Sequence, residues 1–506
     1  MDVTLKACMT RLASLVLLSV ASAAHAQTPS AESGLEYLSV DELGKRMERN
    51  QLSAVTLVQH LQQRIEQLDK QGPAINAIIE LNPEALAIAE SLDQERRAGH
   101  SRGPLHGIPV LLKDNIDTSD QMQTSAGSLA MVGQPAAQDA FIVQQLRAAG
   151  AVILGKTNLS EWANFRDPAI ADGWSSRGGQ TKNPHVLSET PCGSSSGSGA
   201  AVAAGFAPLA VGTETSGSII CPAALNGVVG LKPTVGLLSR TGIIPVTYKT
   251  DTPGPMTRTV REAALLLNAM TGSDNAEPIK TPQSIRSVDY TKWLQPNALA
   301  GRRIGYPVKF DTSIEAKQSD PQFSLALEIM QAAGATLIPV QFIDPESERV
   351  EEAFSMGIKR HLPDYLATRT GLAVQSLEQL VQFNENAPGA EGYGQATLRA
   401  ANDMDFDERT YNQLWQKIQS ENAAAIDDLL VTHQLDALVL DVGSPGLNVA
   451  PLAGYPGIMV PSGIDDGGVP TSVFFFGTRW SEARLLALAY GYEQVSRARR
   501  APAFNP

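Results

Sequence analysis

The sequence predicts an α/β protein, on the evidence of alternating elements, composition and the absence of linkers. Short apolar runs alternate with segments whose apolar residues recur at helical spacing, and this alternation is typical of helices packed on a sheet. Of the 506 residues, 43% are hydrophobic and 18% are charged, as in a globular chain with a large core. Because no internal repeat or low-complexity stretch divides the chain, we expect one domain over residues 27–506.

The first 26 residues have the pattern of a secretory signal peptide. Lys6 and Arg11 give a basic start, residues 12–23 are apolar, and an AHA cleavage site precedes Gln27. The apolar run is shorter than the roughly 20 residues that a membrane span needs. We therefore expect residues 1–26 to be removed and the mature protein to be exported, periplasmic or secreted, with no membrane partner.

The first half of the mature chain opens the alternation. Ser39 and Glu42 have the spacing of a capping box at the start of a helix. Residues 74–81 (AINAIIEL) predict a strand. Residues 83–99 predict a helix, with proline in its first turn and glycine past its end.

A second strand over residues 107–117 (GIPVLLKDNID) runs directly into Lys113. A lysine in this position could extend to the surface. If it is buried instead, desolvation lowers its pKa and makes it a base near neutral pH. Further along, residues 139–150 predict a helix and 151–154 a strand. Because GAVILGKT fits the phosphate-loop pattern only by placing apolar strand residues in the loop, we do not expect phosphate binding there.

Two loops of small residues flank an apolar run in residues 191–222, PCGSSSGSGAAVAAGFAPLAVGTETSGSIICP. Glycine- and serine-rich stretches are usually linkers, but the run between these loops is uncharged and apolar, which predicts that both loops are buried. Serine beside glycine can present a hydroxyl and bare N–H groups to a substrate. Such loops are equipped for acyl-transfer chemistry.

Three segments together, GIPVLLKDNI, CGSSSGSGAAVAAG and GTETSGSIICPA, resemble the amidase signature family. The resemblance implies one α/β/α domain in which helices cover a mixed, mostly parallel central sheet. It also implies a Ser-Ser-Lys mechanism, with Ser218 as nucleophile, Ser194 as bridging serine and Lys113 as base. The two serines are 24 positions apart, which matches the family's spacing.

The implied activity is hydrolysis of a linear amide through an acyl-enzyme. Lys113 takes a proton from Ser194, which takes one from Ser218 as that serine attacks the carbonyl carbon. The main-chain N–H groups of Thr215, Ser216, Gly217 and Ser218 form the implied oxyanion hole. Neither a metal nor another cofactor is called for.

Within the family, SEWANFR, GGQTKNP and the YEQ helix near the C-terminus are similar to bacterial peptide amidases, which release ammonia from C-terminal peptide amides. Other small aliphatic or aryl amides are the alternative substrates. Relatives often carry arginine where Ile220 and Cys221 stand, so we expect an uncharged substrate chain here. The candidate substrate-binding residues are Ser125, Gly127, Trp162, Ile220 and Cys221.

Two other functions are compatible with parts of the sequence. GSSSG fits a nucleophile elbow with Ser195 as nucleophile and His361 or His433 as base, but the elbow requires an apolar strand before it, and HVLSETPC is polar. An exported peptide-binding protein without catalysis is the second alternative. The net charge of −13 argues against a nucleic-acid partner.

The sequence leaves several properties open. Cys192 and Cys221 could form a disulfide or pack as two small thiols, because a disulfide requires a geometry that sequence does not supply. Residues 275–440 carry few motifs, and we expect them to be a variable elaboration on the same core. The physiological substrate and the oligomeric state are not determined by the sequence.

Overall fold

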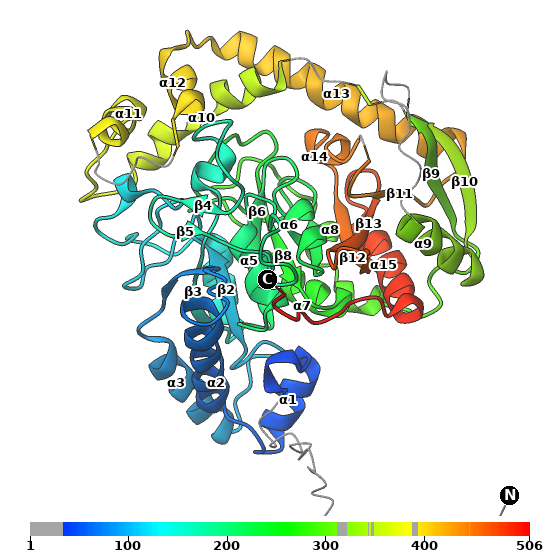
Figure 1. Cartoon of the computed structure of the whole chain (residues 1–506), viewed down its shortest axis with the longest axis horizontal. Coiled ribbons are helices and arrows are strands. Elements are labelled where there is room, and N and C mark those ends of the chain that lie inside the picture. The colour runs from blue at the N-terminus through cyan, green and yellow to red at the C-terminus, as the bar shows by residue number, and fades with distance from the viewer. Residues whose placement is uncertain are drawn as a thin grey trace, which may run out of the picture. The chain divides into compact units, whose positions relative to one another are not determined.

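The structure, a computed structural model, describes residues 34–310, 321–342, 344–345, 349–386, 393–444 and 446–505. The predicted signal peptide lies outside the described residues. Leu35–Pro506 form one compact unit, shown in Figure 1. Among the described residues, no helix combines the length and the apolar character needed to cross a membrane.

The centre of this unit is a sheet with the strand order β1-β3-β2-β6-β8-β7-β12-β13-β11-β9-β10. Its strands are β1 (Ile78–Leu81), β2 (Pro109–Lys113), β3 (Val152–Thr157), β6 (Leu209–Glu214), β7 (Val229–Lys232), β8 (Thr252–Thr257), β9 (Arg303–Phe310), β10 (Thr336–Phe342), β11 (Ala437–Asp441), β12 (Gly457–Ile464) and β13 (Pro470–Phe476). Two short strands, β4 (Trp174–Ser175) and β5 (Gly179–Gln180), form a separate hairpin.

The central sheet is mixed. Strands β3, β2 and β6 run parallel, as do β11, β9 and β10. The remaining pairs among the described strands are antiparallel. The predicted fold class, a mixed sheet flanked by helices, is therefore confirmed, with parallel pairing in these two groups of strands.

Two sets of helices pack on the sheet. A third group, α10, α11, α12 and α13, lies along the top of Figure 1. Helices α5 and α6 pack on each other, and α4, α7, α15 and α9 pack in series. The helices are α1 (Val40–Glu48), α2 (Ala54–Ile65), α3 (Ala85–Arg97), α4 (Phe141–Ala148), α5 (Ser196–Ala203), α6 (Ile220–Leu225), α7 (Val260–Met270), α8 (Gln283–Arg286), α9 (Pro321–Ala332), α10 (Val350–Leu366), α11 (Leu377–Asn386), α12 (Ala396–Asp403), α13 (Glu408–Thr432), α14 (Val449–Leu452) and α15 (Glu482–Ser496).

Most elements predicted from the sequence are present with small changes of length. Ser39 and Glu42 form the predicted capping box. The predicted helix over 83–99 is α3, and the predicted strand over 74–81 is shortened to β1. Most of the GAVILGKT segment is strand β3. Its buried Lys156 donates to the main-chain oxygen of Ile116 at 2.7 Å, so this segment is not a phosphate loop.

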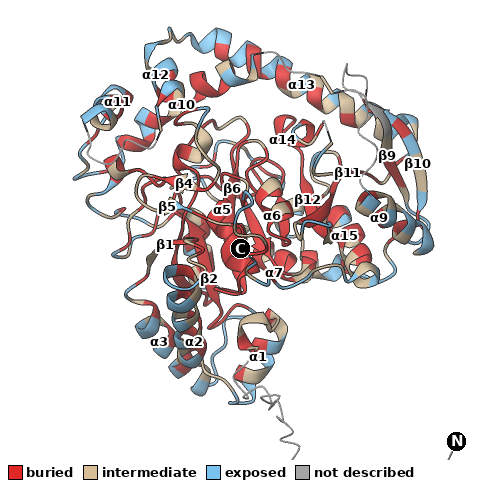
Figure 2. Ribbon diagram, in the orientation of Figure 1, coloured by how far each residue is buried: buried red, intermediate tan, exposed pale blue. Residues whose placement is uncertain are grey.

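The apolar core has two parts. The larger part follows the central sheet, whose strands are mostly buried in Figure 2. The smaller part joins α10, α11, α12 and α13 to side chains near the serine loops, including Trp162 and Val246. Residues 275–440 therefore supply β9, β10 and β11 to the central sheet as well as the helices of the second core.

Helix α5 forms from the glycine- and serine-rich segment because close packing favours small residues there. A Cβ on Gly197 would overlap the main-chain oxygens of Ala77 and Asn158. One on Gly199 would crowd the main-chain oxygen of Pro222. Glycine is a poor helix former, so tertiary packing overrides local preference here.

Replacement of Gly254 by alanine tests the packing of the central strands. Its Cβ would overlap the main-chain oxygen of Leu231 on the neighbouring strand β7. We expect Gly254→Ala to lower the free energy of unfolding by about 1–3 kcal/mol, measured by chemical denaturation. The control, Gly443→Ala, adds a Cβ with no neighbour within 4 Å and should change stability by less than about 0.5 kcal/mol. Equal stabilities for the two variants would contradict this packing.

Candidate active site

Lys113 is the last residue of β2, between the parallel strands β3 and β6. Its side chain is fully buried. The Nζ atom lies 2.8 Å from Ser194 Oγ, 3.0 Å from Ser195 Oγ and 3.1 Å from the main-chain oxygen of Thr213. The sequence-predicted base and bridging serine are thus in direct contact.

Burial lowers the pKa of Lys113 to about 7, although nearby Glu214 and Asp251 act in the opposite direction. Near neutral pH, a substantial fraction of the amine is therefore uncharged and has one lone pair and two N–H groups. The Ser195 hydroxyl can donate to Thr213 O at 3.0 Å, so Ser195 Oγ and Thr213 O both accept from the amine. The lone pair is then left to face Ser194, whose hydroxyl can donate to it.

The two serine loops are held together around this contact. The main-chain N–H of Ser195 donates to the main-chain oxygen of Ser218 at 3.1 Å. A disulfide joins Cys192 to Cys221, with 5.9 Å between their Cα atoms. The two cysteines, whose state the sequence left open, therefore form a covalent link across the two loops. The main-chain bond places Ser218 against the Ser194–Ser195 turn.

A buried carboxylate organises the turn that carries Ser218. Glu214 Oε2 accepts from the main-chain N–H groups of Ile219 at 2.6 Å and Ile220 at 3.0 Å. Within the described part of the chain, the main-chain N–H groups of Ser216 and Ser218 donate to no acceptor. These two groups, from the set predicted for the oxyanion hole, are available to a ligand.

The other two residues of the predicted oxyanion turn have structural contacts. Thr215 Oγ1 donates to Asp251 Oδ1 at 2.7 Å, and Asp251 is buried. Gly217 adopts a φ of +82°, in the left-handed region that favours glycine. Glu214 and Asp251 were missed in the sequence; the only signal for Glu214 was its position at the end of a buried strand, directly before the serine turn.

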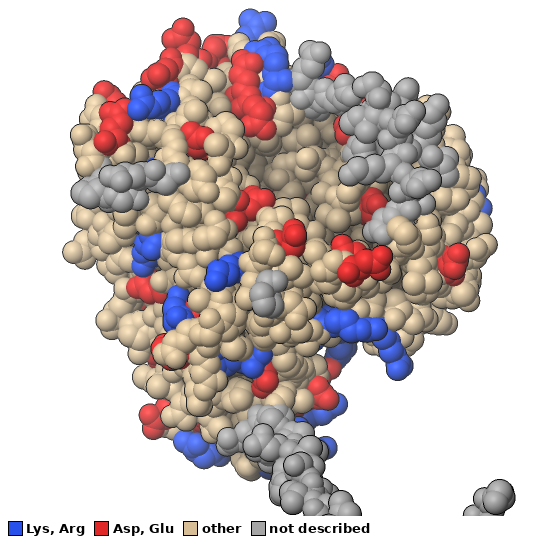
Figure 3. Space-filling model, in the orientation of Figure 1, with Lys and Arg blue, Asp and Glu red and all other residues tan. Residues whose placement is uncertain are grey.

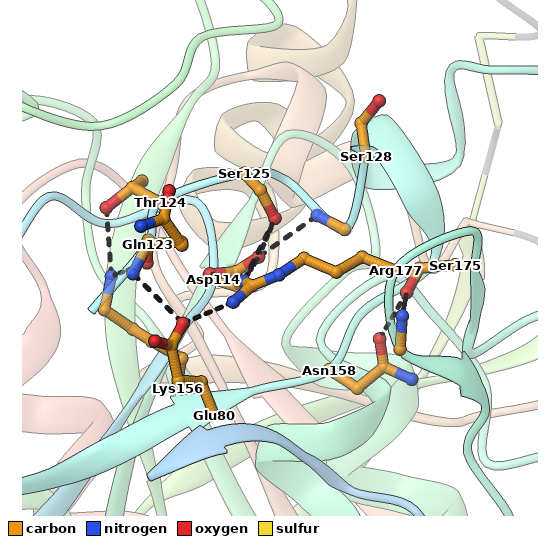
Figure 4. A network of polar contacts seen from close by, with 12 residues as sticks. Glu80, Asp114, Gln123, Thr124, Ser125, Ser128, Lys156, Asn158, Ser175 and Arg177 are labelled. Carbon is orange, nitrogen blue, oxygen red and sulfur yellow. Dashed lines mark hydrogen bonds and ion pairs between the residues drawn. The ribbon is translucent and has the colours of Figure 1, made fainter. Parts of the chain in front are cut away.

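One predicted substrate-binding residue, Ser125, belongs to the buried polar network in Figure 4, and a second, Gly127, contacts the same network. The Ser125 hydroxyl donates to Asp114, and the main-chain N–H of Gly127 donates to Asp114 Oδ2 at 3.3 Å. Arg177 bridges Asp114 and Glu80. This network fixes the loop beside Lys113, since Asp114 directly follows the lysine.

The remaining candidates lie on either side of the serine loops. Trp162 is buried and has a left-handed backbone, with φ of 54°. Ile220 is buried at the start of α6, and Cys221 is held in the disulfide. No cation follows Ser218 at these two positions.

The nucleophile-elbow alternative does not fit the local structure. The residues that precede Ser195 form a loop rather than a strand, and the Ser195 hydroxyl is occupied by Lys113 and Thr213. His361 lies on α10, where its Nε2 contacts the Tyr411 hydroxyl at 3.1 Å. Among the described residues, no group of three or more His, Cys, Asp or Glu side chains is placed to hold a metal ion.

Comparison with known proteins identifies the family. The family model described as Amidase matches residues 56–486, which is most of the chain. The chain belongs to the amidase signature family. The resemblance inferred from the sequence is thereby confirmed.

Similar proteins cover nearly the whole chain. A protein named probable amidase from Arabidopsis thaliana is 38% identical, over 97% of this chain and 96% of its own length. The crystal structure of native peptide amidase from Stenotrophomonas maltophilia is 44% identical, with a TM-score of 0.86, and the match covers 93% of this chain and 99% of that one. An amidase family protein from Bacillus anthracis is 37% identical, with a TM-score of 0.87 and 93% coverage of both chains. This amidase therefore hydrolyses amide carbon–nitrogen bonds.

Replacement of Glu214 tests how the amidase holds its serine turn. Glu214→Ala removes the acceptor for Ile219 and Ile220, so we expect kcat to fall by about 10², the size of effect seen when an oxyanion donor is lost. The control is Glu189→Ala at an exposed position, which should leave kcat unchanged. Because Glu214 is buried, Glu214→Gln provides a second variant of the same shape, and thermal unfolding reports whether each variant is folded. A folded Glu214→Ala variant with the kcat of the parent enzyme would show that the carboxylate does not organise the turn.

Proposed function

We propose that this amidase is an exported enzyme that hydrolyses the C-terminal carboxamide of peptides to the free acid and ammonia. Ser218 is the proposed nucleophile, Ser194 the bridging serine and Lys113 the base. The observation that carries the mechanism is the 2.8 Å contact between a fully buried amine and the Ser194 hydroxyl. A desolvated lysine in this position is a suitable base near neutral pH.

In the proposed acylation step, Ser218 Oγ attacks the amide carbon as its proton passes to Ser194. The Ser194 proton passes in turn to the lone pair of Lys113. Negative charge then develops on the amide oxygen, where the N–H groups of Ser216 and Ser218 can donate. The relay returns a proton to the nitrogen as the carbon–nitrogen bond breaks, and water releases the acyl group by the same route.

The peptide-amide substrate is supported by similarity and by charge. The Stenotrophomonas structure that matches this chain at 44% identity is a peptide amidase. At the two positions where a cation would meet a free carboxylate, this chain has a buried isoleucine and a disulfide-bonded cysteine. An amidated terminus has no such charge, and it therefore needs no cation.

Export is supported by the predicted signal peptide and by the disulfide between Cys192 and Cys221. Disulfides persist in oxidising compartments such as the periplasm and the extracellular space. Intact-mass spectrometry of the protein from such a compartment should give a mature N-terminus at Gln27. A full-length protein retained inside the cell would contradict export.

A substrate panel tests the proposed specificity. Ammonia release should be faster, by kcat/KM, for a dipeptide amide than for acetamide or an aryl amide, by at least about tenfold, because the peptide contributes binding energy that small amides lack. Ser218→Ala should lower the rate by about 10⁴ or more. Equal or better hydrolysis of the small amides would assign the enzyme to the alternative substrate class.

The pH dependence tests the role of Lys113. Below a pH of about 7 the amine is protonated and has no lone pair for Ser194, so kcat/KM should rise with pH through about 7. Lys113→Ala should remove this acid-side limb along with most of the activity. The measurement is the pH dependence of kcat/KM for ammonia release from a peptide amide. If the residual activity of Lys113→Ala still rose with pH through the same midpoint, the titrating group would be a residue other than Lys113.

A further inference from the structure

A small cavity lies beside the oxyanion turn, where Thr213, Glu214 and Thr215 line it. Its volume of about 10 Å³ is close to the minimum that holds one molecule of the size of water. Asn115, Thr213 and Asp251 supply polar groups to its lining, and Ile243 and Ile244 supply apolar ones. All five residues are buried.

The cavity is connected to the proposed base through one residue. Asn115 Nδ2 donates to Thr213 Oγ1 at 2.9 Å, while the main-chain oxygen of Thr213 accepts from Lys113 Nζ. Asn115 also follows Lys113 by two positions in the chain. A molecule in the cavity is therefore close to the atoms that move protons in the proposed mechanism.

The polar lining includes one acceptor that has no donor. Asn115 Oδ1 is buried and has no hydrogen-bond partner among the described residues. Asp251 contributes a carboxylate, and burial raises its pKa to about 6, so it is mostly ionised at pH 7 and above. The guanidinium of Arg240 also lines the cavity, but it donates to Glu277 and to the main-chain oxygen of Tyr248. Because a buried carbonyl oxygen without a donor is unfavourable, the lining favours a small guest that donates hydrogen bonds.

We propose that this cavity receives the ammonia that leaves the carboxamide, with Asn115 Oδ1 as its acceptor. The proposal rests on the proposed function. Ammonia has the size of water and three N–H donors, so it can occupy a cavity of this volume and donate to Asn115 Oδ1.

The bond changes balance without any other reactant. The bond between Ser218 Oγ and the carbonyl carbon has formed when the carbon–nitrogen bond breaks. The electron pair of that bond stays on nitrogen, and the proton delivered by Ser194 completes NH₃. Ammonia then moves into the cavity, which leaves the acyl-enzyme open to water.

The test runs the acyl transfer with ammonia as acceptor. The enzyme is given a peptide methyl ester and rising concentrations of ammonia, at a pH where free ammonia is present, and the ratio of peptide amide to peptide acid is measured. In the proposal, water can still attack the acyl-enzyme while ammonia occupies the cavity. The ratio should therefore level off as the cavity fills. In Asn115→Leu, which removes the acceptor and fills the space, we expect a ratio about tenfold lower that rises linearly.

Matched variants distinguish ammonia binding by Asn115 from a general loss of folding or activity. Asn115→Asp keeps an acceptor and should retain the levelling of the product ratio. Asn412→Leu makes the same change at an exposed site on α13 and should behave as the parent enzyme. The product ratio compares two fates of one acyl-enzyme, so a change in the overall rate of ester hydrolysis does not alter it. Thermal unfolding reports whether each variant is folded.

Two results would overturn the proposal. One is a product ratio that rises linearly with ammonia in the parent enzyme, and the other is an unchanged ratio in a folded Asn115→Leu variant. Both leave the proposed function intact, because the peptide amide would still be hydrolysed through Ser218. Failure of the proposed function itself would appear separately, as ester hydrolysis that persists in Ser218→Ala.

Discussion

The burial of one amine is the constraint on which the rest of the site depends. Lys113 ends a strand between two parallel neighbours, and its Nζ reaches only two hydroxyls and one main-chain oxygen among the described residues. Removal from water lowers the pKa of this amine to about 7. The geometry then assigns different roles to the two serines, because Ser195 is bonded to Thr213 and Ser194 is free to give up its proton.

The surrounding fold keeps this arrangement in place with links between segments that are distant in sequence. The disulfide and the Ser195–Ser218 main-chain bond join the two serine loops, and Glu214 gathers the N–H groups that follow Ser218. The acidic network around Asp114 holds the neighbouring loop. Away from the site, Figure 3 shows Lys and Arg side chains scattered among Asp and Glu on the face drawn, without one continuous basic stripe. This distribution agrees with a small neutral substrate rather than a polyanion.

Sequence reasoning found the elements and residues that local patterns determine. The capping box at Ser39, helix α3 and strand β2 follow from spacing and polarity, and the contact between Lys113 and Ser194 follows from the three family motifs. Contacts between distant segments could not be predicted from the sequence. The helix α5 forms despite its glycines because backbones approach closely there, and Asp251 lies 33 positions after Ser218 with no motif around it. The disulfide needed coordinates for the same reason.

The most direct measurement of the central claim is the titration of the Lys113 amine itself. NMR of protein labelled with ¹³C at lysine Cε gives one titrating signal per lysine, and the Lys113→Arg variant identifies the signal of interest by its loss. This account predicts a midpoint near pH 7 for that signal. A midpoint near 10.5, the ordinary value for lysine, would contradict it, because the amine would then be charged at neutral pH and unable to accept a proton from Ser194.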